Sequence, residues 1–201
     1  METRHSVTLA ELVGKLYSST QVAQIDCLTP DEAALEVLLE FDMSLGGPSL
    51  VTMNRLEGGR LFGRYEIPDR DVFRPLQYCL PHFQRWPDLE WDARDIVEMS
   101  CGHVEALVKR VAERSRWPFG QALRERRVRE TLDSVTYDQA TRFVAVYNDS
   151  KHGFDHTKDT HMFSVCDAVR AYFVARALGN KVYPDARLVT NLSVFDDPQF
   201  P

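Results

Sequence analysis

A long helical pattern between two prolines constrains the fold of this chain most. After Pro87 the residues "DARDIVEMSCGHVEALVKRVAERSR" contain no proline, and Trp117-Pro118 follows them. Side chains of one helical stripe recur at Ile96, Met99 or Ser100, His103, Leu107, Val108 and Val111. The pattern therefore predicts a long helix over this segment, and His103 on its stripe is expected to be a hydrogen-bonded core residue.

Further helical segments are predicted on both sides of this helix. They cover residues 8–19, 32–43, 71–86, 119–132, 139–152 and 160–178. Pro75 and Pro81 predict a break or kink in the third segment. Asp138 is the expected cap of the helix over 139–152. Gly179 and Asn180 are the expected stop of the last helix, whose largely apolar circumference places it at the centre of the core.

These segments predict a mainly all-α fold. Residues 71–183 are expected to form the main domain, in which helices from about residue 88 onwards pack as an antiparallel bundle with short connections. Residues 1–70 are a helical or cap region of unknown role that includes a candidate β-hairpin over 49–68. Residues 184–201 predict an extended surface tail.

Composition excludes some functions and places the chain in one compartment. The formal net charge is −6, so a nucleic-acid surface must be a local patch. The four cysteines form no CxxC pair and predict buried thiols in a reducing compartment. No segment approaches the roughly 18 to 20 apolar residues that span a bilayer. We therefore expect a cytoplasmic protein without a membrane partner.

Three of the six histidines lie within residues 147–161, "YNDSKHGFDHTKDTH". His152, His156, Asp159 and His161 together offer nitrogen and oxygen ligands of the kind that zinc or manganese accepts. Gly153, however, predicts a helix end between the first two histidines. No H-E-x-x-H motif occurs in the chain. We therefore expect no cofactor or metal, and keep these four residues as reserve ligands.

The same stretch also carries a family resemblance. The segments "CGHVEALVKR", "YNDSKH" and "DAVRAYFVARALG" follow one another in a helical context. In this order they resemble the motif region of the HEPN superfamily. The motif of that family is an arginine, four to six residues of which the first is often polar, and a histidine. Asn148 matches the polar residue and His152 matches the histidine, whereas Tyr147 stands at the arginine position.

This resemblance implies a metal-independent ribonuclease in which two copies of the motif meet across a homodimer. His152 would act as general acid or base, because imidazole takes both protonation forms near neutral pH. Lys151 would supply a point charge, and Tyr147 one hydrogen bond in place of a charged arginine fork. The candidate catalytic residues are therefore His152, Asn148, Lys151 and Tyr147.

A basic run interrupts the acidic chain between residues 109 and 129. Two acidic residues, Glu113 and Glu125, lie within it. The eight basic residues are Lys109, Arg110, Arg114, Arg116, Arg124, Arg126, Arg127 and Arg129. Eight positive charges less two negative ones give the run a net charge of +6. Such a run either binds RNA phosphates, or forms solvated helix faces paired with acids such as Glu130, Asp133 and Asp138.

The leading hypothesis is an HEPN-like RNA-associated protein of the defence or toxin type. If this protein is an enzyme, the hypothesis makes it a divergent metal-independent endoribonuclease. Its expected partners are a second copy of the chain, RNA, and a protein such as an antitoxin. The alternative is a non-catalytic helical module for dimerisation or protein binding, with the missing arginine as its signature. A second alternative is a metal-dependent hydrolase that uses the reserve ligands.

Overall fold

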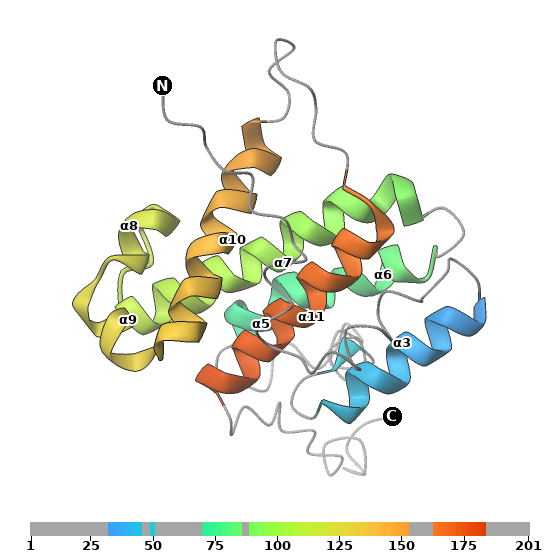
Figure 1. The fold of residues 1–201 in the computed structure, drawn as a ribbon, viewed down its shortest axis with the longest axis horizontal. Coiled ribbons are helices and arrows are strands. Elements are labelled where there is room, and N and C mark those ends of the chain that lie inside the picture. Colours follow the sequence, from blue (N-terminus) through green and yellow to red (C-terminus); the bar gives the residue numbers. More distant parts are fainter. Residues whose placement is uncertain (1–31, 46–48, 51–69, 86–88, 153–162, 184–201) are drawn as a thin grey trace, which may run out of the picture.

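The computed structural model describes residues 32–45, 49–50, 70–85, 89–152 and 163–183 (Figure 1). These residues contain helices and no strand, which confirms the prediction of a mainly α-helical protein. The helices are α3 (Glu32–Ser44), α5 (Arg70–Gln77), α6 (Cys79–Phe83), α7 (Leu89–Ala112), α8 (Phe119–Leu123), α9 (Arg126–Thr131), α10 (Ser134–His152) and α11 (Val165–Val182). The predicted helix over 8–19, nearly all of the candidate hairpin and the tail lie outside the described residues.

The long helix α7 is the element against which most others pack. It contacts α5, α6, α8, α9, α10 and α11 (Figure 1). Ile96, His103 and Leu107 of the predicted stripe are buried along it, and Val97 and Val104, outside that stripe, are buried as well. The predicted break in the segment over 71–86 is also confirmed, because α5 ends at Gln77 and α6 begins at Cys79.

The last helix, α11, lies at the centre of the core, as its apolar circumference predicts. Residues 171–176 are all buried. The Tyr172 ring packs edge-on against Phe83 at a centroid distance of 5.4 Å and against Phe173 at 5.2 Å. Burial of these rings stabilises the fold by roughly 2 kcal/mol each.

A buried ion pair joins α3 to α11. The Asp42 carboxylate lies 2.8 Å from the Arg176 guanidinium, and both side chains are inaccessible to solvent. The same carboxylate accepts hydrogen bonds from the Tyr172 hydroxyl at 2.8 Å and from the Leu50 backbone N–H at 2.6 Å. Burial, with the Asp42 charge beside it, raises the pKa of Tyr172, so the phenol keeps the proton that it donates. Every formal charge in this cluster therefore has a partner.

The Asp42 cluster extends along α3 and α11. Arg176 also donates to the Asp42 carbonyl at 3.1 Å and to the Asn180 side chain at 3.1 Å. Asn180 in turn donates to the Leu45 carbonyl at 3.2 Å. These bonds satisfy carbonyl groups at the end of α3, which has no further helical turn to accept them. Part of the predicted N-terminal region thus packs into the same core as residues 71–183.

His103 is a buried core histidine, which confirms its predicted role. Its Nδ1 lies 2.7 Å from the Val72 carbonyl and therefore carries the ring proton, because a carbonyl only accepts. Burial lowers the pKa of His103 to about 4, so the ring is neutral at pH 7. A methyl group added to Gly179 would lie 2.7 Å from His103 Nε2. Gly179 therefore lets the α11 backbone approach the imidazole.

The ends of the C-terminal helices differ from the predictions. Gly179 and Asn180 were the expected stop of α11, yet the helix continues to Val182 because both residues make core contacts inside it. Its start is also later than residue 160, at the N-cap Ser164, where a capping box with Asp167 fixes the first turn. The predicted end was therefore wrong, because a tertiary contact determines the position of Gly179.

Two other helix boundaries were also predicted wrongly. Helix α10 begins at Ser134, because the Asp133 carboxylate, and not Asp138, accepts the Thr136 backbone N–H at 2.8 Å. The predicted single helix over 119–132 is two short helices, with Glu125 in an extended conformation between them. Helix α10 is described as far as His152, the last residue of the predicted helix.

Removal of one partner of the buried ion pair should destabilise the protein strongly. We expect Arg176→Met to lower the free energy of unfolding by about 3 to 5 kcal/mol, because Asp42 is left charged and unpaired. Urea unfolding measures the change. Arg126→Met is the matched control, since Arg126 pairs with Glu130 on the surface and should cost under about 1 kcal/mol. Equal losses for the two variants would contradict the role given to the buried pair.

Alanine should have opposite effects at two helical glycines. Gly179→Ala places a methyl group against His103 and should lower the free energy of unfolding by about 1 to 3 kcal/mol. Gly102→Ala meets Pro75 at an ordinary 3.6 Å and should raise it by up to about 1 kcal/mol through helix propensity. Chemical denaturation of both variants tests this pair, and a stabilising Gly179→Ala would be the contrary result.

Candidate nucleic-acid interface

The C-terminal end of α7 directs the chain into the basic run. Glu113 takes a left-handed conformation with φ of 55°. Its N–H donates to the Arg110 carbonyl at 3.1 Å, and the Arg114 N–H donates to the Lys109 carbonyl at 3.0 Å. These two bonds form a Schellman motif, which reverses the chain and ends the helix four residues before the predicted end at Arg116.

Aromatic side chains support the turn that follows. The Arg114 guanidinium lies 5.3 Å from the centre of the Trp117 ring, and Arg129 lies 5.8 Å from that of Tyr137. Phe119 and Leu123 are buried and attach α8 to the core. Cation–π contacts hold the two arginines without neutralising their charge.

Part of the basic run is paired with acids. Lys109 pairs with Glu105 at 2.7 Å, Arg126 with Glu130 at 2.6 Å, and Arg127 with Glu113 at 2.6 Å. The expected pairing with Glu130 is thus confirmed. Asp133 pairs instead with Lys181, whose hydrogen bond, with those from Thr136, lowers the pKa of Asp133 to about 2.

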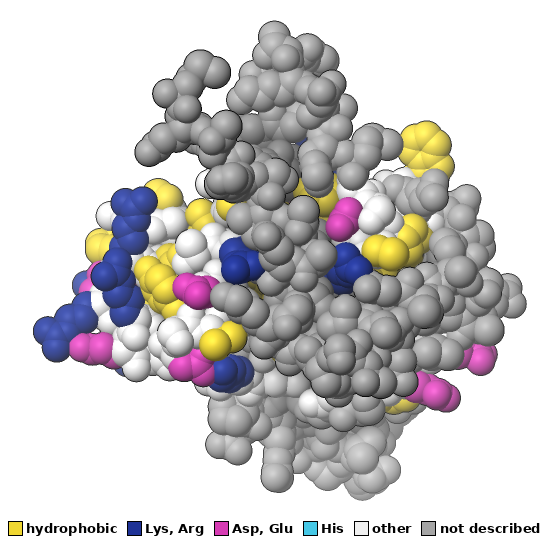
Figure 2. All heavy atoms as spheres, in the orientation of Figure 1, with side chains coloured by type: hydrophobic (Ala, Val, Ile, Leu, Met, Phe, Trp, Pro, Cys, Tyr) yellow, Lys and Arg dark blue, Asp and Glu magenta, His cyan; other side chains and the backbone are white. Residues whose placement is uncertain are grey.

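Four arginines of the run have no carboxylate partner among the described residues. They are Arg114, Arg116, Arg124 and Arg129, and all four are exposed. Figure 2 shows dark blue side chains gathered at the end of the molecule where α8 and α9 lie. We call residues 109–129 the basic surface. It presents arginines whose charge is available to phosphates.

A pocket of about 590 Å³ adjoins the basic surface at the end of α7. The described residues that line it are Ala106, Lys109, Arg110, Glu113, Arg114 and Ser115. Three cationic side chains, one carboxylate and one hydroxyl group therefore border a space large enough for a nucleotide-sized ligand.

Tyr147 has a packing role in the structure. Its ring lies edge-on to Phe119 at a centroid distance of 6.1 Å, and the side chain is half-buried against the core. Asn148, the next residue, is exposed. Tyr147 therefore links α10 to α8. Helix α8 directly follows the turn that carries Arg114 and Arg116.

Tyr147 also lines a groove of about 430 Å³ between α5, α7 and α10. The other lining residues are Arg74, Pro75, Tyr78, Asp95, Glu98, Met99 and Gly102. Arg74 donates to the Tyr78 hydroxyl at 2.9 Å and lies over its ring. Arg74 and Tyr147 thus line the same groove.

For two other predicted catalytic residues, the structure describes the backbone but not the side chains. Lys151 and His152 form the last turn of α10, and their side chains lie outside the described residues. The reserve metal ligands His156, Asp159 and His161 also lie outside them. The predicted constellation of four catalytic residues therefore stays a prediction.

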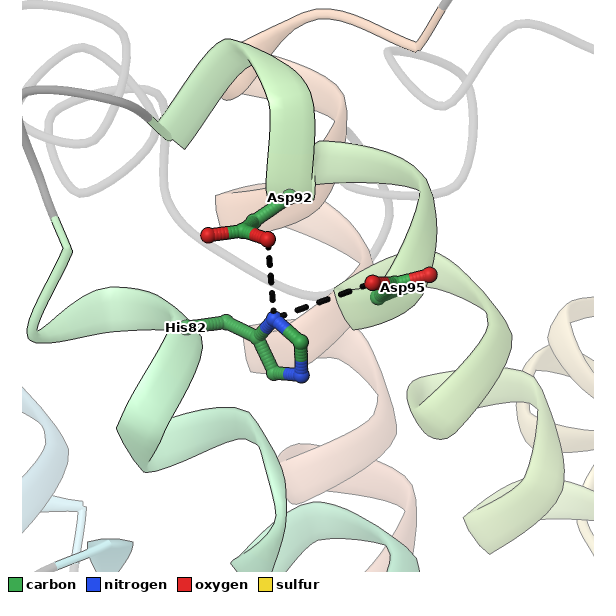
Figure 3. A group of neighbouring side chains, drawn as sticks. All are labelled: His82, Asp92 and Asp95. Atoms are coloured by element: carbon green, nitrogen blue, oxygen red, sulfur yellow. Dashed lines mark ion pairs between the residues drawn. The ribbon is translucent and has the colours of Figure 1, made fainter.

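In the described part of the chain, one group of three metal-ligating side chains lies elsewhere. His82 of α6 faces Asp92 and Asp95 of α7 (Figure 3). The spacing of ten and three residues matches no metal motif, so the sequence patterns did not indicate this group. The aspartates one helical turn apart were the only local signal.

Two further observations concern similarity to known proteins and the length of the apolar helices. Searches against protein-family models, curated proteins and solved structures found no match to this chain. Among the described residues, no helix is both long enough and apolar enough to cross a membrane.

Proposed function

We propose that this chain is an HEPN-like RNA-associated protein that binds RNA phosphates through the basic surface. The observation that carries the proposal is the set of four exposed arginines without carboxylate partners among the described residues of an otherwise acidic protein. Binding of RNA depends on such local cations, and aromatic rings beside them offer stacking partners for bases. Trp117 is the ring beside them: it is half-buried, and the Arg114 guanidinium lies over it.

The arrangement of the last helices supports the HEPN-like part of the proposal. Lys181 near the end of α11 pairs with Asp133 at the start of α10, so the two helices meet at opposite termini. Both α10 and α11 pack on α7. The opposite directions of α10 and α11 agree with the predicted antiparallel packing, whereas α7 and α11 run in the same direction (Figure 1). In our proposal, the exposed Asn148 near the end of α10 faces a second copy of the chain.

Tyr147 favours RNA binding without cleavage. A phosphate clamp needs a charged, planar donor at the motif position. The Tyr147 ring instead packs against Phe119 and brings no charge. Cleavage therefore depends on a cation from another position, and the proposed function is RNA association in a helical dimer.

Replacing two arginines that lack a carboxylate partner in the described structure should weaken RNA binding. We expect Arg116→Gln/Arg124→Gln to lower the affinity for a single-stranded RNA oligonucleotide. We also expect the slope of log affinity against log salt to fall by about 0.7 for each phosphate that the variant no longer neutralises. Fluorescence anisotropy over a range of salt concentrations measures both quantities.

The matched control removes two positive charges that have acidic partners. Arg126→Gln/Arg127→Gln makes the same change in net charge, yet both arginines already pair with Glu130 and Glu113. This variant should bind RNA more tightly than the first. Equal affinity of the wild type and the Arg116/Arg124 variant would contradict the proposed surface.

RNA cleavage tests the catalytic alternative directly. We expect the wild type and His152→Ala to degrade mixed RNA at the same background rate in EDTA, because no charged clamp stands at Tyr147. Gel analysis of a time course measures the rates. Cleavage by the wild type that His152→Ala abolishes would instead support the ribonuclease.

A further inference from the structure

Three potential ligand atoms converge between α6 and α7. His82 Nδ1 lies 3.3 Å from an Asp92 carboxylate oxygen and 3.8 Å from an Asp95 carboxylate oxygen (Figure 3). All three ligand atoms lie within 4.8 Å of one another. Bond lengths of about 2.0 to 2.1 Å around tetrahedral zinc correspond to ligand–ligand separations of about 3.3 Å. Small movements of the carboxylates therefore suffice to bring these atoms around one ion.

Arg85 already places a positive charge at this point. Its guanidinium donates to one Asp92 oxygen at 2.9 Å, pairs with the other at 2.9 Å, and lies 3.1 Å from His82 Nδ1. His82 Nδ1 thus lies among one guanidinium and two carboxylates, at the point where a cation is already held. Neutral imidazole nitrogen and carboxylate oxygen are the donor set that zinc accepts.

We propose that His82, Asp92 and Asp95 bind one divalent transition-metal ion, zinc by the chemistry of its ligands, and that this ion and Arg85 are alternative cations. The inference is independent of RNA binding, because none of these residues belongs to the basic surface.

The burial of the side chains fits an exchange between the two cations. The His82 and Asp92 side chains are 14% and 13% exposed and are held by their helices. Arg85 is 58% exposed, so it can turn outward into solvent. A partly exposed ion pair contributes at most about 1 kcal/mol, so its loss is a small cost against coordination by three ligands.

The position of Asp95 gives the ion an accessible side. Asp95 is 52% exposed and also lines the groove that contains Arg74 and Tyr147. With three protein ligands, a tetrahedral zinc ion keeps one coordination position for water or a ligand. A small anionic group in the groove is the ligand that such an ion would bind.

Zinc affinity of single variants tests the site. The full chain is treated with EDTA, dialysed and titrated with zinc by calorimetry. We expect one ion per wild-type chain, and at least about tenfold weaker binding for His82→Ala and for Asp95→Asn. We expect Arg85→Gln to bind up to about fivefold more tightly, because the competing cation and its ion pair of at most about 1 kcal/mol are gone. Cobalt in place of zinc should give the visible absorption of a tetrahedral site in the wild type, and His82→Ala should lack that absorption.

Two control variants distinguish this site from other donors. Glu98→Gln lies on the same helix outside the cluster, and His156→Ala removes a histidine of the reserve set; both should bind zinc like the wild type. Circular dichroism confirms that each variant is folded. Absence of zinc binding in both the wild type and Arg85→Gln overturns the proposal, as does binding that His82→Ala leaves unchanged. RNA affinity measured on the same variants should not change, so failure of one proposal is distinguishable from failure of the other.

Discussion

The buried pair of Asp42 and Arg176 is the interaction on which the described fold depends. It joins residues 134 positions apart in sequence, and its carboxylate also accepts from Tyr172 and Leu50. Two charges without solvent are tolerated only when each is matched and hydrogen-bonded. A shifted position of α3 would leave both charges unpaired in an apolar environment. The pair therefore selects one register for α3 against α11, in addition to any stability it contributes.

Local signals predicted the helices well, and tertiary contacts explain the errors. The apolar stripe of α7 and the apolar surface of α11 were visible because burial imposes a period on the sequence. Gly179 was misread because a glycine that ends a helix looks the same as one that allows a close approach to His103. Asp133 and Asp138 are both plausible caps by residue type, and only the hydrogen bond to Thr136 distinguishes them. No local pattern pairs Asp42 with Arg176.

The candidate sites were predictable to a smaller extent. The run of basic residues in the sequence located the basic surface, but which arginines are paired depends on contacts such as that of Arg127 in α9 with Glu113 in the turn after α7. The family-like motif indicated Tyr147 as a departure, and the structure shows why a tyrosine suits that position, since its ring packs on Phe119. The sequence gives no signal for the group of His82, Asp92 and Asp95, because the histidine and the aspartates lie on different helices that only the fold brings together.

The capping box at the start of α11 connects a local sequence signal to the register of the buried core. Ser164 and Asp167 bond reciprocally, so the first turn of α11 is specified by four adjacent residues. The register that places Gly179 at His103 and Arg176 at Asp42 follows from that local start. The core register of α11 is therefore written in the residues from Ser164 onwards, so a change at either capping residue acts on the buried ion pair about three helical turns away.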